Sequence, residues 1–571
     1  MIETMKITFT ENELKKYENW TLSDFLMQKG IQLHLPCGGN GTCQKCSVLV
    51  HFQGEDTSTE RDVLACQTKV RELLRICQNT GATSLCIIYE TKSAAMTGET
   101  SFYKPEDTSG VLCSSIAEGA RALSCSNGPS YNSSGKLYAA IDLGSTTIAI
   151  ELFRGNGEVI HTWSAENPQR LYGNDVLSRI RAASESTITR SDLQRLAESK
   201  IQEGLAVLTK DPVINPRQLT PDKFLQGLCI AANTTMGHLL TGEDVSPLGH
   251  APFSPGNIGL EEISSVFFLP SEDTPPVYRL PGISAFVGGD IVSGIYALDM
   301  DLSSHWTLLL DLGTNGEMAL ARRFGDVLTI YCTSTAAGPA FEAANISCGC
   351  AGVEGAIRHV TINERGRCIP SLISSEARTT TSAVLPASYR IQQDLKKSMT
   401  RPLGLCGSGL ISAVSSLYEK GLIDCKGTFV KDRHRKEGFP LWQLPGQHPL
   451  LLQQEDIRQL QMAKAAIRAG ISCLLDTAGI REEDLHQVYL AGGFGKGLDP
   501  TDAANIGLLP RAILPVTTAV GNSALAGAKK FLLERDKGRL HRIQDCATEI
   551  LLADTKDFQD LYLANMDLPL R

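Results

Sequence analysis

The feature of this sequence that most constrains its fold is a partial internal duplication. The first copy reads LYAAIDLGSTTIAIELFRGNGEVI, and the second begins 169 residues later and reads WTLLLDLGTNGEMALARRFGDVLTI. Each copy contains an apolar strand, the tripeptide D-L-G, a few small polar residues and two more apolar strands. A repeated strand–turn–strand unit predicts two similar α/β lobes that face each other across a cleft.

Each D-L-G tripeptide opens a tight hairpin that can bind phosphate, because glycine allows close approach and successive backbone N–H groups form an anion-binding concavity. The expected phosphate-binding residues are Gly144, Ser145, Thr146 and Thr147 in the first copy and Gly313, Thr314, Asn315 and Gly316 in the second. Asp142 and Asp311 end the preceding strands, where a carboxylate can hold Mg²⁺ directly or through water. Single D-G turns are common, but two copies with the same following strands indicate a nucleotide site.

A third glycine-rich segment, QVYLAGGFGKGLDP, lies near the C-terminal end. Its apolar strand runs into Gly492 and Gly493, which are followed by Phe494. A Gly-Gly turn at a strand end allows a flat base to lie on the backbone, although a simple strand-to-helix turn has the same pattern.

These three segments, in this order, resemble the actin/sugar-kinase/Hsp70 superfamily. The resemblance implies duplicated ribonuclease-H-like α/β lobes that clamp ATP between two phosphate hairpins and a late adenosine motif. It places the first phosphate motif at 142–147, the second at 311–317 and the adenosine motif at 491–495.

Four cysteines near the N-terminus form a second pattern. Cys37, Cys43, Cys46 and Cys66 have the spacing C-x5-C-x2-C-x19-C, and the first three lie in PCGGNGTCQKC. A tight cysteine loop with one distant cysteine is typical of [2Fe–2S] ferredoxins, although plant-type members have x4 at the first interval. These thiolates therefore predict a cluster that carries one electron at a time.

Residues 1–92 are expected to form an α+β ferredoxin-like (β-grasp) domain. Strands are predicted at MKITFT, CSVLVHF, LRICQ and SLCIIYE, and a short helix is predicted at SDFLMQKG. Cys77 and Cys86 are interpreted as small core residues. The following segment, 93–136, is rich in Ser, Thr and Gly and predicts a flexible linker with one short helix, SSIAEGARAL.

A ferredoxin-like domain fused to this ATPase fold resembles the reductive activators of corrinoid proteins. Shared segments include NPQRLYGNDVLSRI, ANTTMGHLL, TAAGPAFEAANI, GLCGSGLI and GNSALAGA. The resemblance implies a middle domain at 137–212, an ATPase domain at 213–571 and a homodimer. It also implies an ATP-dependent enzyme that passes one electron from its cluster to the Co(II) corrinoid of a methyl-transfer protein and restores Co(I). An external low-potential donor is then expected to reload the cluster.

Several carboxylates are candidates for the ATPase chemistry. Asp142 and Asp311 are assigned to Mg²⁺ and phosphate. Asp175, Asp290, Glu317 and Glu342 are candidates for positioning water, with helix capping or fold stabilisation as the alternative role. His238 and His250 are expected to be structural.

The composition excludes several classes of function. The chain has 571 residues and a net charge of −9, which argues against nucleic acid as a partner. No apolar run reaches the roughly 18 residues of a membrane helix. The first residues lack the pattern of a secretory signal. Seventeen cysteines without such a signal indicate reduced thiols and a cytoplasmic location.

Three alternatives remain open. The first is an ATP-driven electron donor to another low-potential enzyme, as in radical dehydratase activators. Those proteins typically hold a [4Fe–4S] cluster through ATPase-domain cysteines and lack a ferredoxin domain, so the four N-terminal cysteines argue against this reading. The second is a redox-regulated small-molecule kinase, and the third is a redox-regulated binding protein without electron flow.

Overall fold

The computed structural model describes most of the chain. The described residues are 2–29, 31, 46–53, 58–92, 136–173, 175–212, 214–215, 217, 219–264, 269, 274–343, 345–373, 401–444, 448–492 and 497–570. Cys37, Cys43, Gly493, Phe494 and the expected helix SSIAEGARAL lie outside these residues.

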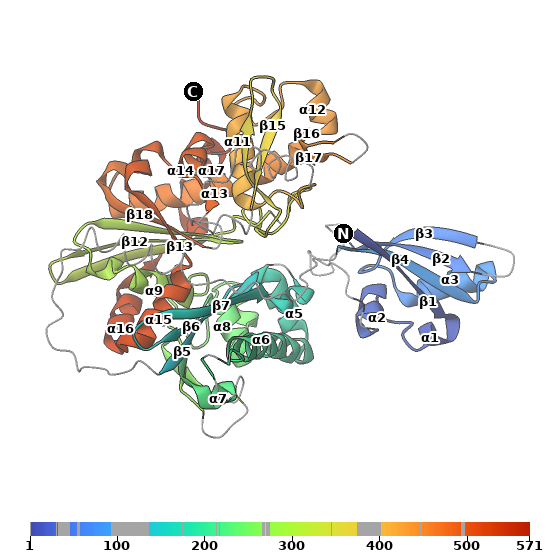
Figure 1. Cartoon of the computed structure of the whole chain (residues 1–571), viewed down its shortest axis with the longest axis horizontal. Helices are drawn as coiled ribbons and strands as arrows, with labels where there is room; N and C mark the ends of the chain where they lie inside the picture. Colours follow the sequence, from blue (N-terminus) through green and yellow to red (C-terminus); the bar gives the residue numbers. More distant parts are fainter. Residues whose placement is uncertain are drawn as a thin grey trace, which may run out of the picture.

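The N-terminal unit is a four-stranded antiparallel sheet with helices (Figure 1). The strand order is β1-β4-β2-β3. Its elements are β1 (Ile2–Thr10), α1 (Glu11–Lys15), α2 (Leu22–Gln28), β2 (Ser47–Gln53), β3 (Ser58–Leu64), α3 (Val70–Thr80) and β4 (Ser84–Lys92). Cys77 and Cys86 are buried in its core, as expected from the sequence.

The strand predicted at LRICQ is wrong, because these residues belong to helix α3. Val70, Leu73, Leu74 and Cys77 are buried along one side of the helix. Their spacing of i, i+3, i+4 and i+7 is the apolar period of a helix, which a five-residue window does not reveal. Gly81 ends the helix in the left-handed conformation.

The first lobe contains a six-stranded sheet of order β7-β6-β5-β8-β10-β9. Its strands are β5 (Leu137–Leu143), β6 (Thr147–Arg154), β7 (Val159–Glu166), β8 (Leu225–Ala232), β9 (Glu261–Ile263) and β10 (Val277–Arg279). Its helices are α5 (Val176–Glu185), α6 (Thr187–Leu208), α7 (Pro221–Phe224) and α8 (Thr234–Thr241). Because β8 pairs with β5 in parallel, the sheet continues past the domain boundary expected at residue 212.

The second lobe repeats this arrangement with the order β19-β18-β11-β12-β13-β20. Its strands are β11 (Trp306–Leu312), β12 (Gly316–Phe324), β13 (Val327–Thr335), β18 (Leu485–Ala491), β19 (Thr517–Gly521) and β20 (Ala547–Glu549). In both lobes an antiparallel three-stranded meander is followed by a parallel strand beside its first member. The duplicated α/β fold expected from the sequence is therefore confirmed.

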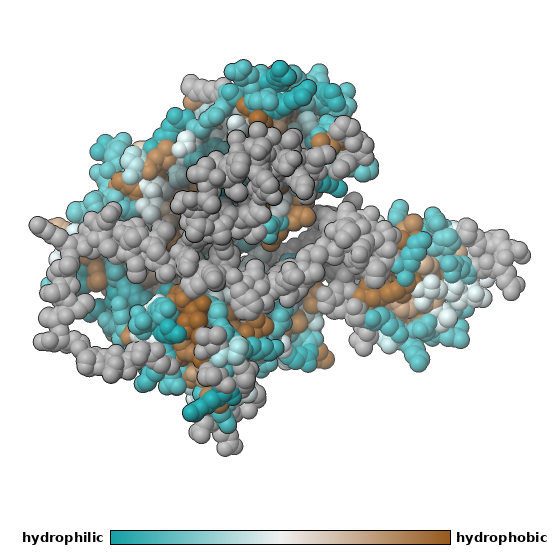
Figure 2. All heavy atoms as spheres, viewed as in Figure 1, coloured by the Kyte–Doolittle hydropathy of each residue, from teal (hydrophilic) through white to brown (hydrophobic). Residues whose placement is uncertain are grey.

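Further elements cover the second lobe. They are α11 (Gly407–Glu419), α12 (Asp432–Glu437), α13 (Gln454–Ala478), α14 (Pro500–Asn505), α17 (Phe558–Ala564) and the hairpins β14 (Ile357–Ile362)/β15 (Cys368–Leu372) and β16 (Phe439–Trp442)/β17 (Leu450–Leu452). Figure 2 shows hydrophilic side chains over α12, whose described residues include none that is buried.

One hydrophobic core joins the two lobes. It contains Ala140 and Cys229 from the first sheet and Leu309 and Ala319 from the second. The helices that complete this core are α9 (Gly289–Ala297), α15 (Ser523–Glu534) and α16 (Lys537–Cys546). The lobes are therefore held together through packed helices, and Thr146 and Thr314 of the two D-L-G hairpins lie with their hydroxyl oxygens 3.1 Å apart.

Candidate functional site

The first hairpin connects β5 to β6 and is shaped by donors from outside it. The side-chain amide of Asn167 donates to the Gly144 carbonyl at 2.8 Å, and its backbone N–H donates to the Thr146 carbonyl at 2.8 Å. Nη2 of Arg179 donates to the carbonyl of Ser145 at 2.5 Å. Three successive carbonyls are thereby fixed.

This pattern orients the hairpin amides for an anion. In a trans peptide the carbonyl and the next N–H point in opposite directions, so the N–H groups of Ser145 and Thr146 face away from Asn167 and Arg179. Among the described residues, neither amide has a hydrogen-bond acceptor. Successive unpaired N–H groups of this kind bind phosphate oxygens.

Sequence reasoning missed Arg179 and Asn167 as parts of this site. Both side chains are fully buried. Burial lowers the pKa of Arg179 to about 10, and nearby Asp175 and Glu342 oppose that shift. The only signal available was their place in the NPQRLYGNDVLSRI segment, and nothing in that segment links Arg179 to a hairpin 34 residues earlier.

The second hairpin connects β11 to β12 and lies against the third glycine motif. The Gly313 amide donates to the Asn315 carbonyl at 3.0 Å, which closes the turn. Gly492 follows the last residue of β18 and has a φ of +94°, and a Cβ there would lie 2.9 Å from Oδ1 of Asp311. Only glycine therefore fits at this position, and the strand end of 491–492 touches the carboxylate of the second D-L-G.

The two hairpins meet across the cleft at Glu342. Its Oε2 accepts hydrogen bonds from the hydroxyls of Thr146 and Thr314, each at 2.9 Å. The two hydroxyl oxygens are 3.1 Å apart. Burial raises the pKa of Glu342, and the two hydroxyl donors oppose that shift.

Four other acids gather beside the hairpins. Asp142 and Asp311 end β5 and β11, Asp290 lies in the first turn of α9, and Glu317 faces Asp311 across the β11–β12 ladder. Desolvation raises the pKa of Asp142 to about 7, of Asp311 to about 8 and of Asp290 to about 6. The pKa of Glu317 is also raised, first by burial and then by Asp290 and Asp311.

The carboxylates repel one another, and this is a second cause of the raised pKa values of Asp142, Asp311 and Glu317. A cluster of carboxylates of this kind is suited to binding a cation. Within the described ranges, no three His, Cys, Asp or Glu side chains are close enough to hold a metal directly. Mg²⁺ usually keeps several of its waters and takes one or two carboxylates together with substrate phosphates.

Asp175 has a different position. It is the N-cap of α5, and its carboxylate accepts from the Ser178 amide and hydroxyl, both at 2.8 Å. This is the capping role that the sequence left open as an alternative. His238 is buried between the Thr234 carbonyl and the Gly256 amide, which is a structural role.

The described part of the cysteine motif consists of Cys46 and Cys66. Cys46 immediately precedes β2 and Cys66 lies just after β3, and both side chains are buried. Their sulfur atoms are 3.2 Å apart although the residues are 20 positions apart. Two convergent, buried thiols fit ligands of one iron of a [2Fe–2S] cluster.

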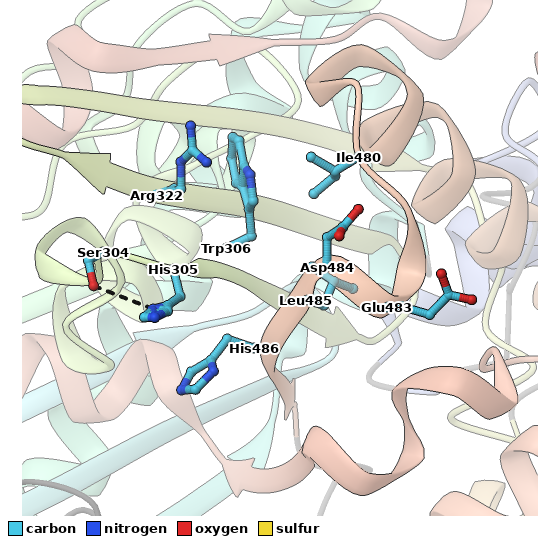
Figure 3. A pocket seen from close by; sticks show the side chains of 9 residues that line it. All are labelled: Ser304, His305, Trp306, Arg322, Ile480, Glu483, Asp484, Leu485 and His486. Carbon is cyan, nitrogen blue, oxygen red and sulfur yellow. Dashed lines mark hydrogen bonds between the residues drawn. The ribbon is translucent and has the colours of Figure 1, made fainter.

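A cavity of about 510 Å³ lies elsewhere, at the amino ends of β11 and β18 (Figure 3). It is lined by Ser304, His305, Trp306, Arg322, Ile480, Glu483, Asp484, Leu485 and His486. The second hairpin and Asp311 lie at the opposite, carboxyl end of β11, where α/β sheets bind ligands. This cavity is therefore separate from the candidate nucleotide site.

Of the helices that the structure describes, none is long and apolar enough to cross a membrane.

Three family models match consecutive parts of the chain. Residues 9–71 match a 2Fe-2S iron-sulfur cluster binding domain, and 137–303 match the RACo middle region. Residues 305–571 match the C-terminal domain of RACo, the ASKHA domain. The chain therefore contains a 2Fe–2S domain and a domain of the ATP-binding ASKHA type.

Similar proteins share this organisation. The chain is 29% identical to a corrinoid activation enzyme, RamQ, of Eubacterium limosum, over 98% of each chain. It is also 29% identical to a [Co(II) methylated amine-specific corrinoid protein] reductase of Methanosarcina barkeri, over 50% of each chain. A solved structure of a reductive activator for corrinoid, iron-sulfur protein is 26% identical, with a TM-score of 0.65 and coverage of 97% and 96%. The chain therefore combines a 2Fe–2S domain with the RACo middle region and the RACo ASKHA domain, and over nearly its whole length it is similar to reductive activators of corrinoid proteins.

Proposed function

We propose that this protein is an ATP-dependent reductive activator that passes one electron to the Co(II) corrinoid of a partner methyl-transfer protein and restores Co(I). The observation that carries the proposal is the presence, in one chain, of convergent cysteine thiols and a two-lobed phosphate site. Relatives named for corrinoid activation, which match nearly the whole chain, support the choice of acceptor.

The electron balance of the proposed reaction is simple. Cys37, Cys43, Cys46 and Cys66 would hold a [2Fe–2S] cluster, which supplies one-electron chemistry when bound. Co(II) gains one electron and becomes Co(I), and the N-terminal domain loses one. An external low-potential donor replaces that electron.

Energy from ATP is needed because Co(II) is hard to reduce. Plant-type clusters have potentials of roughly −400 mV, and we expect the Co(II)/Co(I) couple to lie lower. Each ~59 mV of deficit is a tenfold penalty in the equilibrium, or about 1.4 kcal/mol. A gap of roughly 100 mV thus needs about 2–3 kcal/mol, which differential binding of nucleotide to two lobe arrangements can supply.

In this proposal each described side chain at the cleft has a task. The Ser145 and Thr146 amides bind phosphate oxygens of ATP, and the corresponding residues of the second hairpin, Gly313 to Gly316, bind the others. Asp142 and Asp311 would hold Mg²⁺, which would neutralise charge on the phosphates, and Glu317 would position the attacking water. Gly492, with Gly493 and Phe494, forms the adenosine side.

We also propose that the protein acts as a cytoplasmic homodimer, and that 213–571 carries out the ATPase chemistry together with the first hairpin of 137–212, whose strand β5 pairs with β8 of the later segment. The large number of cysteines supports a reducing compartment. Asp175 stays a second candidate for orienting water, because Arg179, which it affects electrostatically, holds the first hairpin.

The test is a reconstitution with the whole chain. The protein, a Co(II) corrinoid protein, Mg-ATP and a low-potential reductant are mixed anaerobically, and the cobalt absorbance is followed. Co(I) is expected only with ATP. Cys66→Ala should abolish the [2Fe–2S] EPR signal and the reduction, whereas Cys425→Ala, at a half-buried position on the second lobe, should preserve both.

Two results would count against the proposal. Equal formation of Co(I) without ATP would contradict the coupling of nucleotide to electron transfer. Stimulation of ATP turnover by a sugar or carboxylate, without any response to the corrinoid protein, would favour a redox-regulated kinase instead.

A further inference from the structure

Glu342 lies where the two candidate phosphate hairpins meet. It lies seven positions after Thr335, the last residue of β13, and its Oε2 accepts hydrogen bonds from both hairpin threonines. Thr146 belongs to the first lobe and Thr314 to the second. One carboxylate oxygen therefore bridges the two lobes at the point where the phosphate hairpins meet.

A phosphate oxygen and this carboxylate oxygen compete for the same donors. Each threonine hydroxyl has a single proton to donate. In the structure both hydroxyls are within 2.9 Å of Oε2, so a hydroxyl that turns to a phosphate leaves the carboxylate. The two anions also repel each other at short range, and this repulsion favours a complete exchange over sharing.

Arg179 is the cation that can receive the released carboxylate. Arg179 and Glu342 contact adjacent residues of the first hairpin, because Nη2 of Arg179 donates to the Ser145 carbonyl and Oε2 of Glu342 accepts from the Thr146 hydroxyl. The charge of each group also affects the pKa of the other. Nη1 of Arg179 has a thioether, Met236 Sδ at 3.1 Å, as its acceptor in the structure. Thioether sulfur is a weak acceptor, and a carboxylate is a strong one.

The segment that carries Glu342 has one firm anchor on its far side. The amide and hydroxyl of Ser347 both donate to the carboxylate of Asp456, each at 2.6 Å. Asp456 lies in the first turn of α13 and is buried. A displacement of Glu342 is therefore limited on this side by the Ser347–Asp456 anchor, and the neighbouring Phe341 is buried in the core.

We propose that Glu342 is a positioning residue that ties the two phosphate hairpins together in the empty site and is displaced toward Arg179 when the phosphates of a nucleotide bind. The displacement makes the turn at 336–343 report whether the site is occupied. This inference rests on the proposed ATP site and adds a means by which that site signals to the rest of the second lobe.

The first test is nucleotide affinity of the full-length protein without any corrinoid partner. Glu342→Gln keeps the size of the side chain and removes its charge, so the competing anion is lost. Calorimetry should show ATP binding that is roughly tenfold tighter than in the wild type, the scale of one hydrogen bond to a charged group. Glu364→Gln, in the exposed β14–β15 turn, is the matched control and should bind ATP like the wild type.

The second test separates positioning from a merely structural role. Hydrogen exchange of 336–343 is measured with and without ATP, ADP and AMP. In the wild type, ATP should change the exchange of this segment. In Glu342→Gln the segment should exchange at the same rate with and without ATP, because the contact that ATP breaks is already weakened. Glu342→Ala serves as a second variant and should behave in the same way.

The outcomes are distinguishable. If the wild type binds ATP and Glu342→Gln binds it equally or more weakly, the inference is overturned while the ATP site stands. The inference is also overturned if ATP changes the exchange of 336–343 in Glu342→Gln as much as it does in the wild type. If the wild type binds no nucleotide at all, the proposed function fails together with the inference.

Discussion

The side-chain amide of Asn522 donates a 2.6 Å hydrogen bond to Oδ2 of Asp142, which lies 380 positions earlier in the chain. The same asparagine caps α15 by accepting from the Leu525 amide at 2.7 Å. One residue thus connects the shared helical core to the carboxylate of the first D-L-G. Its hydrogen bond also lowers the pKa of Asp142, against the stronger effect of burial.

Replacement of Asn522 by alanine should therefore have two separable effects. Loss of the cap should cost about 1 kcal/mol of stability. Loss of the donor should raise the pKa of Asp142 further and shift the pH profile of ATP hydrolysis to more alkaline values. Ser186→Ala, which removes only the cap of α6, should lower stability without moving the profile. Equal profiles for the two variants would show that Asn522 does not tune Asp142.

The acids predict how stability depends on pH when Mg²⁺ and nucleotide are absent. The pKa of Asp142 is raised from 3.8 to about 7, and that of Asp311 from 3.8 to about 8. A carboxyl with a raised pKa stabilises the fold when it is protonated, and that contribution is lost as the pH rises through the folded-state pKa. In EDTA the melting temperature should fall between pH 5 and about 8.

The matched variant for this measurement is the double change Asp142→Asn and Asp311→Asn, which should flatten the pH dependence. Addition of Mg-ATP to the wild type should raise the melting temperature most at the alkaline end, where the carboxylates are ionised. A melting temperature that rises from pH 5 to 8 in EDTA would contradict the raised pKa values.

Gly492 offers a test of the close approach between β18 and the second hairpin. An added Cβ would lie 2.7 Å from the Leu312 carbonyl oxygen and 2.9 Å from Asp311 Oδ1, at a φ of +94°. Gly492→Ala should cost about 1–3 kcal/mol of stability and weaken ATP binding. Gly479 also has a positive φ, but nothing lies within 4 Å of its added Cβ. Gly479→Ala should therefore show the conformational strain alone, with ATP affinity intact. If Gly492→Ala and Gly479→Ala bound ATP equally well, the contact between residue 492 and Asp311 would not affect ATP binding.

Arg179 is predicted to act on ATP through the shape of the first hairpin. Arg179→Lys retains the charge but cannot make the separate contacts of Nε to the Gly173 carbonyl and Nη2 to that of Ser145. We expect a higher KM for ATP, a smaller change in kcat and a loss of about 1–3 kcal/mol of stability. The control is Arg181→Lys, on an exposed side chain paired with Glu185. If Arg179→Lys lowered stability but left KM unchanged, the orienting role would be wrong.

The sequence predicted the two-lobed fold because its signals are local. Apolar alternation and the D-L-G turns lie within about 25 residues of each copy, and their strands pair as expected. The helix at LRICQ could not be predicted from these five residues, because its apolar period extends from Val70 to Cys77. The bridge from Thr146 to Glu342 and the bond from Asn522 to Asp142 could not be predicted, because they depend on how distant elements pack.

The core shared by the two lobes determines how the cleft can move. Helices α9 and α15 pack backbone to backbone, since a Cβ on Gly527 would lie 2.0 Å from the Ser293 carbonyl oxygen. Because α9 and α15 belong to the core shared by both sheets, a movement of one lobe relative to the other has to be accommodated at this contact. A methyl group at residue 527 would push α9 and α15 apart. That separation would alter the distance between the two D-L-G hairpins, which have to bind the phosphates from both sides.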